Sequence, residues 1–414
     1  MREQSQNYYF GLDIGTSVVR CVIGSIDHAE GAELSIVGHG SAPNMGMRKG
    51  SIVHVEDVAD AIRSAIDEAE RVSGITVRQA TVNINGNHVL GLNSRGVVAI
   101  SAANRAIDNE DRLRVDEAAA IIQMPPNREI VQIFARSYRL DGQDNIKDPV
   151  GMQGVRLEVD THIVTAATPN LRNLDIAMDK AGVSIKNYTL SSLASAEAVL
   201  NRQQKEAGTL LLNIGAGTTN MVVVEDGEIQ HVAVLPVGGM NITNDLAIGL
   251  RTDLDIAELV KVQHASLSPT PSHKSRVAVQ YEGKMHQFDA EEVRMITEAR
   301  VDELLELVDK ELRKIQKSRK LPGGIVLVGG SALLPGIADF AKEKLQLSAR
   351  VGRLQPLGGV IDTVNDPSYS TAVGLVLLDM LLISSNHGHP TGKPNSNAFG
   401  LIENLLNRIT KKAR

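Results

Sequence analysis

The chain has 414 residues, is 43% apolar and 3% aromatic, contains no Trp and carries a formal net charge of −6 at pH 7. This length accommodates two or more domains with buried cores, and an acidic chain without a basic stripe of interleaved aromatics is not expected to bind nucleic acid. The single cysteine, Cys21, excludes internal disulfides and zinc clusters, and neither a signal peptide nor an apolar run long enough to span a bilayer is recognisable.

The first part of the chain alternates strands and helices. The pattern predicts an amphipathic helix over about residues 55–72 that ends at Gly74. The predicted strands around it are Tyr8–Leu12, Val18–Ile26, Leu34–Ser41 and Ala80–Asn85. This order indicates a mixed sheet with helices packed on it.

Residues 86–161 interrupt this pattern. They contain extended segments at Val97–Ile100 and Ile130–Leu140, and a polar helix near Asp108–Ile122. Turn formers occur at Pro125-Pro126 and Asp148-Pro149. We interpret this stretch as an inserted small α/β subdomain.

The layered pattern then resumes and continues into a second lobe. The first lobe closes with a strand at His162–Ala167, a helix at Pro169–Ala181 and a strand at Ile185–Leu190, and a helix over about 193–203 crosses to the second lobe. The elements predicted there are strands Thr209–Asn213, Met221–Glu225, Gln230–Pro236 and Ile325–Val328, a helical segment Ile242–His264, a hairpin Arg276–Phe288 and a long helix Asp289–Ser318.

One glycine-rich phrase occurs twice, 200 positions apart. Residues 11–17 read Gly-Leu-Asp-Ile-Gly-Thr-Ser, and residues 212–219 read Leu-Asn-Ile-Gly-Ala-Gly-Thr-Thr. Each lies between two apolar strands, which predicts a β-hairpin turn. Glycine lets backbone N–H groups approach a phosphate oxygen, and a neighbouring hydroxyl adds a donor, although a single such turn is more often only turn chemistry.

A third glycine turn, Gly329-Gly330-Ser331, follows an apolar strand and precedes a helix that begins after Pro335. At the carboxyl end of a strand, bare backbone of this kind can pack against a nucleoside. Three turns in the order hairpin, hairpin, strand-to-helix indicate a two-lobed clamp for a nucleotide.

This ordered triad resembles the phosphate-1, phosphate-2 and adenosine motifs of the actin/Hsp70/sugar-kinase superfamily. Residues 236–247 resemble the segment that enters its fourth subdomain, residues 257–261 its Ala-Glu-x-x-Lys helix, and residues 367–374 its last connecting helix. The resemblance implies a two-lobed actin-like α/β ATPase fold that binds ATP, with Mg²⁺ held through water by Asp13. The implied nucleotide contacts are Asp13, Gly15, Thr16, Ser17, Asn213, Gly215, Ala216, Gly217, Thr218, Thr219, Gly238, Gly239, Glu258, Lys261, Gly329, Gly330 and Ser331.

Within the superfamily the chain resembles the FtsA family of actin-like bacterial division proteins, which carries an inserted subdomain between the two phosphate turns. The expected parts are a first-lobe core (1–85 and 162–192), the insert (86–161), a second-lobe core (193–243 and 322–383), a fourth subdomain (244–321), a linker (384–396) and a terminal helix (397–414). The resemblance implies head-to-tail filaments of the chain, a location at the division site on the cytoplasmic face of the membrane, and contacts with other division proteins.

The same resemblance implies that the chain recruits the tubulin-like division protein FtsZ through the fourth subdomain. Arg294 and Arg300, early on the predicted long helix, are candidate contacts for the acidic C-terminal peptide of that partner. The alternative is that both arginines are solvated charges of an amphipathic helix.

The C-terminal segment carries a physical pattern of its own. Residues 384–396 form a Gly/Pro/Ser/Asn linker with a root-mean-square reach of roughly 20 Å. The following helical pattern has one apolar face and one basic face, which predicts reversible binding to membrane lipids rather than packing on the chain's own domain. The apolar residues are Phe399, Leu401, Ile402, Leu405, Leu406 and Ile409, and the basic ones include Arg408, Lys411 and Lys412.

Asn213 and Asn220 lie at positions where the superfamily usually has carboxylates that order the metal ion. An amide supplies neither charge nor a base, so we expect ATP binding with very slow or no hydrolysis, and no catalytic residue is assigned. Two alternatives share the fold. A PilM-like pilus-assembly protein would bind a membrane partner's peptide and need no lipid-binding tail, and a metabolite kinase would need a catalytic base and a substrate pocket that are not recognisable here.

Overall fold

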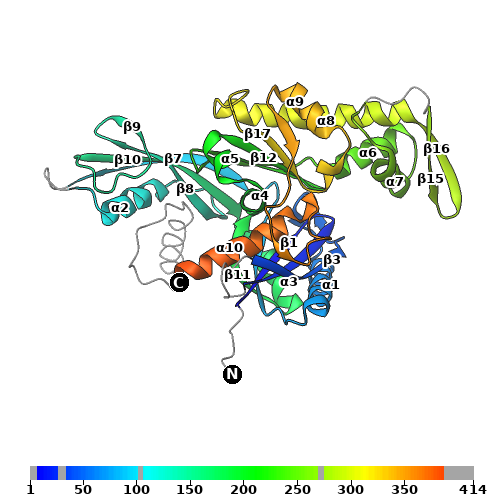
Figure 1. Cartoon of the computed structure of the whole chain (residues 1–414), viewed down its shortest axis with the longest axis horizontal. Helices are drawn as coiled ribbons and strands as arrows, with labels where there is room; N and C mark the ends of the chain where they lie inside the picture. The colour runs from blue at the N-terminus through cyan, green and yellow to red at the C-terminus, as the bar shows by residue number, and fades with distance from the viewer. Residues whose placement is uncertain (1–6, 27–33, 101–105, 269–274, 387–414) are drawn as a thin grey trace.

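The computed structural model describes residues 7–26, 34–100, 106–268 and 275–386. Figure 1 shows one lobe above the other, with an inserted sheet projecting at one end of the upper lobe and a subdomain of helices and a hairpin at the other end. Two helices, α4 (Ser191–Val199) and α10 (Ser370–Asn386), pack on each other between the lobes. Residues 387–414, which include most of the predicted linker and all of the predicted membrane helix, lie outside the described residues.

The first lobe is a mixed sheet, as the sequence predicts. Its strand order is β11 (Ser184–Leu190), β6 (Gln79–Ile84), β1 (Asn7–Ile14), β2 (Val18–Ile26), β3 (Leu34–Pro43) and β19 (Gly358–Gly359). Helices α1 (Val55–Ser73) and α3 (Thr168–Ala181) cover one face, and α10 packs against β1 on the other. Gly74 ends α1 with φ 71°, a conformation that favours glycine. A small hairpin, β4 (Met47–Arg48) and β5 (Ser51–Ile52), lies beside this sheet.

The insert is a four-stranded antiparallel sheet with one helix. The strand order is β7 (Leu90–Ala99), β10 (Arg156–Ala167), β8 (Arg128–Leu140) and β9 (Gln143–Ile146). Helix α2 (Asn109–Ala120) begins at Asp108, whose Oδ1 accepts a hydrogen bond from the Asp111 N–H at 2.9 Å. Strand β10 continues past position 161, where the sequence analysis ends the insert, with a shift of register against β8 between Asp160 and Thr161. The sheet of the insert therefore leads directly into α3 of the first lobe.

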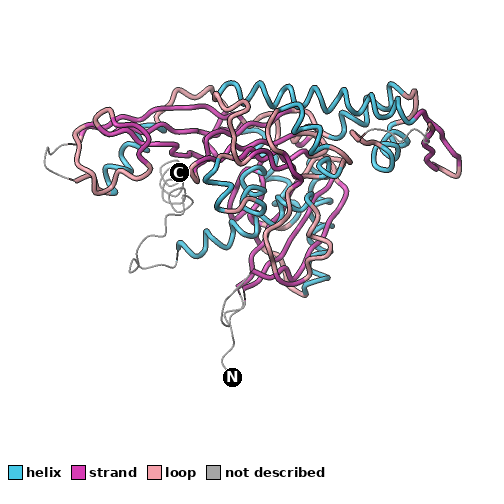
Figure 2. The backbone as a smooth tube through the Cα atoms, turned by 45° about the horizontal axis from the view of Figure 1, so that its top comes forward, coloured by secondary structure: helices cyan, strands magenta, loops and turns pink. Residues whose placement is uncertain are grey.

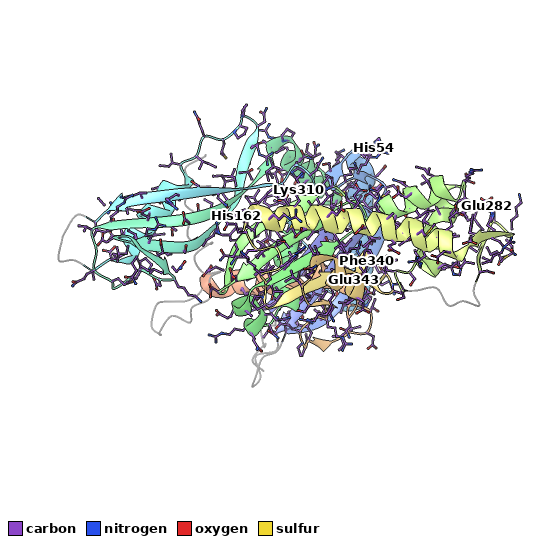
Figure 3. All side chains as sticks on the ribbon, turned by 90° about the horizontal axis from the view of Figure 1, so that it is seen from above. His54, His162, Glu282, Lys310, Phe340 and Glu343 are labelled. Atoms are coloured by element: carbon purple, nitrogen blue, oxygen red, sulfur yellow. The ribbon has the colours of Figure 1, made fainter. Side chains whose placement is uncertain are left out.

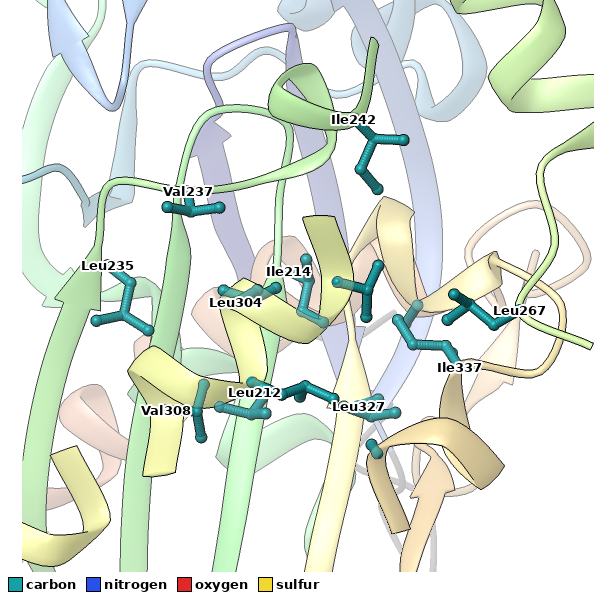
Figure 4. Close-up of a cluster of buried hydrophobic side chains, with 14 of the residues drawn as sticks. Leu212, Ile214, Leu235, Val237, Ile242, Leu267, Leu304, Val308, Leu327 and Ile337 are labelled. Atoms are coloured by element: carbon teal, nitrogen blue, oxygen red, sulfur yellow. The ribbon is translucent and has the colours of Figure 1, made fainter. Parts of the chain in front are cut away.

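The second lobe contains the second mixed sheet, in the order β14 (Glu228–Leu235), β13 (Thr219–Glu225), β12 (Thr209–Ile214), β17 (Gly324–Val328) and β18 (Ala349–Val351). Figure 4 shows its core, in which Leu304 and Val308 of α8 (Ala290–Lys314) lie over Leu212 of β12 and Leu327 of β17. Helix α9 (Ile337–Leu345) completes this layer. The apolar face expected on the long helix is therefore a packing face.

Two predicted helical segments are each divided into two helices in the structure. The segment 193–203 splits into α4 and α5 (Arg202–Ala207), since Asn201 accepts a hydrogen bond from the Gln204 N–H at 2.9 Å and starts a new helix. The segment 242–264 splits into α6 (Gly239–Gly249) and α7 (Leu254–His264) at Arg251, whose φ is 53°. Helices α6 and α7 pack together, and α7 packs on the hairpin β15 (Arg276–Tyr281)–β16 (Lys284–Asp289), in the region where the sequence analysis expects a fourth subdomain.

The insert also contacts the second lobe. Figure 3 shows His162 on the insert next to the body of the protein. Its Nε2 accepts a hydrogen bond from the Val232 N–H of edge strand β14 at 3.0 Å, and Arg136 Nε donates to Gln230 Oε1 at 3.2 Å. On the first-lobe side, Gln132 Nε2 donates to Thr189 Oγ1 at 3.3 Å. The insert therefore contacts both lobes. Figure 2 shows its long strands running into the body of the protein.

Candidate nucleotide site

The two glycine hairpins adopt the same turn. In the first, the Gly15 N–H donates to the Val18 carbonyl at 3.1 Å, and in the second the Gly215 N–H donates to the Thr218 carbonyl at 2.9 Å. Both turns join an interior strand of a sheet to its antiparallel neighbour, β1 to β2 and β12 to β13. The repeated phrase in the sequence thus corresponds to a repeated structure, one copy in each lobe.

The hairpins face each other across a cleft of about 410 Å³, a volume within the range of ligand pockets. They approach closely at its base, where Thr218 Oγ1 donates to Asn85 Oδ1 of the first lobe at 3.0 Å. A Cβ on Gly217 would lie 2.9 Å from the side chain of Thr16, so glycine is required there. The predicted residues that line the cleft are Asp13, Gly15, Thr16, Ser17, Asn213, Gly215, Ala216, Thr218, Gly239, Glu258, Lys261, Gly329, Gly330 and Ser331.

Three predicted contacts lie behind the cleft surface rather than on it. Gly217 packs against Thr16, and Thr219 Oγ1 donates to the Val237 carbonyl at 2.8 Å. A Cβ on Gly238 would lie 2.6 Å from the Gly215 carbonyl oxygen, which explains the glycine at the start of α6. These residues hold the second hairpin and α6 together.

Asp13 is buried and held by a polar network. Asn83 Nδ2 donates to Asp13 Oδ1 at 2.8 Å and to Ser191 Oγ at 2.9 Å, while Asn83 Oδ1 accepts from the Ile14 N–H at 2.7 Å. Burial raises the pKa of Asp13 to about 6, and the positive charge of Arg20 opposes this shift. Asp13 is the only carboxylate among the described residues that line the phosphate end of the cleft.

The amides of the second hairpin are also buried. Asn213 and Asn220 are direct partners across β12 and β13 and both line the cleft. Asn213 Nδ2 donates to Ser195 Oγ at 2.9 Å and to Thr371 Oγ1 at 2.8 Å. The amide group is thereby fixed in one orientation, and it offers no negative charge to a metal ion.

The opposite end of the cleft is built by α6, α7 and the third glycine turn. Lys261 Nζ donates to Glu258 Oε2 at 2.6 Å and to Thr243 Oγ1 at 2.9 Å. Gly329 has φ 88°, and a Cβ there would lie 2.5 Å from Asn213 Oδ1. The third turn therefore packs directly on the second hairpin, so all three predicted turns meet at one cleft.

The side chains that line the cleft could hold Mg²⁺ only together with a phosphate, which would supply further oxygen ligands. Within the described ranges no group of three His, Cys, Asp or Glu side chains could hold a metal ion. Magnesium usually keeps several waters and takes one or two carboxylates together with substrate phosphates. Asp13 can hold such an ion through water, and the bound ion would neutralise phosphate charge.

Sequence analysis missed Arg20, Asn83, Asn85, Ser191 and Thr371 at this site. Four of them line the cleft, and Asn83 lies directly behind Asp13. Asn83 lies near the end of β6 and Asn85 directly follows it, so their position beside the first turn follows from the parallel pairing of β6 with β1. Ser191 and Thr371 lie on helices between the lobes, and nothing in their local sequence marks them.

The two candidate partner contacts lie on α8 and are ion-paired. Arg294 contacts Glu291 and Glu298 of its own helix. Arg300 forms ion pairs with Asp245 of α6 and with Glu303, and its Nη2 donates to Asp245 Oδ1 at 2.9 Å. Arg300 therefore contributes to the packing of α6 on α8 whatever else it contacts.

Solved structures define the class of this fold. The structure is similar to that of the PilM–PilN type IV pilus biogenesis complex, with a TM-score of 0.63 at 17% identity over 90% of this chain and 98% of that chain. It is also similar to MreB5 of Spiroplasma citri bound to ADP, with a TM-score of 0.52 at 14% identity over 92% and 99% of the two chains. The protein thus has the actin-like ATPase fold, with a small α/β insert in its first lobe.

Sequence comparison narrows the class to a family. Residues 210–374 match the model of the cell division protein FtsA, and residues 86–165 match the SHS2 domain inserted in FtsA. The FtsA of Bacillus subtilis is 39% identical over 89% of this chain and 82% of that protein, and the FtsA of Pseudomonas aeruginosa is 36% identical over 90% and 89%. The chain belongs to the FtsA family of cell division proteins.

Proposed function

We propose that this actin-like division protein binds ATP between its lobes and tethers FtsZ filaments to the cytoplasmic face of the cell membrane at the division site. ATP acts as a ligand for conformation and for head-to-tail polymerisation, and its turnover is very slow or absent. The observation that supports the nucleotide site best is the pair of equivalent glycine turns, one per lobe, facing each other across a cleft of about 410 Å³. Glycine turns that line a cleft in this way suit a polyphosphate, because glycine lets the backbone approach phosphate oxygens closely.

The proposed membrane contact rests on the pattern of residues 397–414, whose apolar face is opposite a basic face. Among the described helices none is long and apolar enough to cross a bilayer. An interfacial helix would attach each copy weakly, and a filament carrying many copies would bind firmly. Similarity to the PilM complex supports a shared fold and does not favour a role in pilus assembly.

The test is co-sedimentation of the full chain with vesicles that contain phosphatidylglycerol. The full chain is expected to pellet with these vesicles, to bind less at high salt, and to bring FtsZ filaments into the pellet. The chain ending at residue 396 and the variant Leu405→Asp are expected to remain in the supernatant, whereas the polar-face control Asn407→Gln should pellet normally. Equal pelleting of the truncated chain would contradict the tether.

A further inference from the structure

A cavity of about 80 Å³ lies where the insert meets the second lobe. Its walls come from α2 and β8 of the insert, from α4 between the lobes, and from the turn that joins β13 to β14. Its volume is enough for several water molecules and therefore for an alkyl group of a few carbons. The apolar side chains of its lining include Ile133, Phe134, Leu193, Val224 and Ile229.

Two carboxyl groups that line this cavity have no cation partner. Asp116 of α2 is buried, and its carboxylate accepts a hydrogen bond from the Tyr138 hydroxyl at 3.1 Å. Burial raises the pKa of Asp116 to about 7, although Tyr138 and the positive charge of Arg112 oppose this shift. Glu228, at the start of β14, is half-buried. Within the ranges that the structure describes, neither carboxyl forms an ion pair, and that of Glu228 also accepts no hydrogen bond.

The cations that line the same cavity already have partners. Lys205 of α5 pairs with Glu197 of α4 at 2.6 Å. Lys147, which follows β9, pairs with Glu206 of α5 at 3.3 Å, and Arg136 donates to a side chain of β14 at 3.2 Å. Because a buried carboxylate is stable only when it is paired, the cavity retains two acidic groups that a further cation would satisfy.

We propose that this cavity binds a small aliphatic amine, whose ammonium group pairs with Asp116 and Glu228 while its alkyl chain packs on the apolar lining. Both carboxyls lie near one phenol, because their charges add to the effect of burial in raising the pKa of Tyr138. An ammonium group has three N–H donors, enough for both carboxyls, and its hydrogen bonds to ionised oxygens are strong. Such a ligand would contact the insert and the second lobe at once.

The protonation of the two carboxyls determines how binding depends on pH. Burial raises the pKa of Glu228 to about 7, a shift that Lys147 opposes and Glu206 increases. Asp116 has a pKa in the same range. An ammonium ion pairs with the ionised carboxyl, so binding releases protons below about pH 7, and affinity should increase about tenfold per carboxyl between pH 6 and pH 8.

The test is calorimetric titration of the full chain with n-butylamine at pH 8 and pH 6, with butan-1-ol as an uncharged probe of the same length. Butylamine is expected to bind at least about tenfold more tightly at pH 8 than at pH 6, and at pH 8 at least about tenfold more tightly than butanol. Asp116→Asn and Glu228→Gln should each weaken butylamine binding at pH 8 by about tenfold or more. Glu117→Gln, which removes an exposed acid of α2, is the matched control and should bind normally.

The possible results separate this inference from the proposed function, because no described residue lines both this cavity and the nucleotide cleft. Equal binding of butylamine and butanol would overturn the inference, since the cavity would then recognise only apolar groups. Butylamine binding that is unchanged in both variants, or absent from the native chain, would also overturn it and would leave the nucleotide site unaffected. Thermal unfolding without ligand checks that each variant is folded, and either folded variant suffices to decide.

Discussion

Asp13 shows how a single buried charge links the site to stability. Its pKa of about 6 in the folded protein exceeds the value near 4 of an unfolded chain, so the native state binds the extra proton and stability falls as pH rises between these values. Asp13→Asn removes this loss, and its amide oxygen can still accept the hydrogen bond from Asn83. We expect the nucleotide-free variant to gain up to about 3 kcal/mol at pH 8 and almost nothing at pH 4.

Urea denaturation at both pH values, with no nucleotide present, measures this difference. The exposed acid Asp60 on α1 offers a control, because Asp60→Asn should change stability little at either pH. If Asp13→Asn is no more stable than the native protein at pH 8, burial does not raise the pKa of the Asp13 carboxyl.

Asn213 determines how strongly the second hairpin favours a metal ion. In Asn213→Asp the hydroxyls of Ser195 and Thr371 can rotate to donate to the new carboxylate, which adds a charge to the cleft. We expect ATP binding to become more dependent on Mg²⁺ and ATP turnover to increase. The native chain should turn over well below about 1 s⁻¹, the low end for typical enzymes. The measurement is phosphate release from ATP by both proteins. Rapid turnover by the native chain would contradict the prediction that Asn213 keeps hydrolysis slow.

The three turns were predictable at this scale because glycine and hydroxyl residues that follow an apolar strand favour a turn through local backbone geometry alone. Arg20 and Asn83 were not, because their roles depend on which residues face each other across paired strands. Asp13 faces Arg20 only in the register that the hairpin adopts. The burial of Asn213 between Ser195 and Thr371 depends on helices far away in the sequence.

At the scale of elements, His162 connects the insert to the second lobe. Its Nδ1 lies 2.8 Å from Asn93 Oδ1, and its Nε2 accepts from Val232, so the ring is neutral. Burial, with a smaller contribution from nearby His231, lowers its pKa to about 3. Between pH 6.5 and 3 the unfolded chain binds a proton that the native ring does not, so stability falls with falling pH by up to about 1.4 kcal/mol per unit.

In His162→Gln an amide can replace both hydrogen bonds without titrating. Between pH 6 and 4.5, the unfolding free energy of this variant should change less steeply with pH, by up to the contribution of one proton, about 1.4 kcal/mol per pH unit. The control variant His54→Gln, which replaces an exposed residue, should keep the native pH dependence. The pKa of His231 is also lowered, so a residual slope is expected. An unchanged slope in His162→Gln would show that this ring titrates normally.

The ion pair between Arg300 and Asp245 makes a prediction about α6 and α8. Both side chains are about three-quarters buried, at 22% and 27% exposure, so Arg300→Glu should destabilise the protein by about 1–2 kcal/mol. The exchange Arg300→Asp with Asp245→Arg should recover most of this stability. If Arg300 contacts the FtsZ peptide, the exchanged variant will remain defective in peptide binding. Normal binding by the stable exchanged variant would remove Arg300 from that surface.

Most elements were predictable from apolar periodicity, including α1, α3 and the long α8. The breaks between α4 and α5 and between α6 and α7 were not, because a capping asparagine and a single residue with positive φ interrupt sequences that otherwise favour helix. Strands such as β19, with two residues, carry no pattern of their own and exist only through pairing with β3.

At the scale of the whole molecule, the actin-like architecture was predictable because the order of the three turns resembles the order of the superfamily's nucleotide-binding motifs. The contacts of the insert were not predictable. It follows β6 and precedes α3 in the first lobe, yet its sheet also bonds to β14 of the second lobe. A movement between the lobes must therefore change these contacts as well as the cleft.

The central claim is that one nucleotide is held by both lobes at once. Hydrogen exchange measured with and without ATP tests it most directly, because each turn can be followed in its own peptide. The claim predicts slower exchange of the amides around residues 15–18, 215–218 and 329–332 on addition of ATP, with little change in the exposed hairpin β15–β16. Protection in one lobe alone, or in neither, would contradict it.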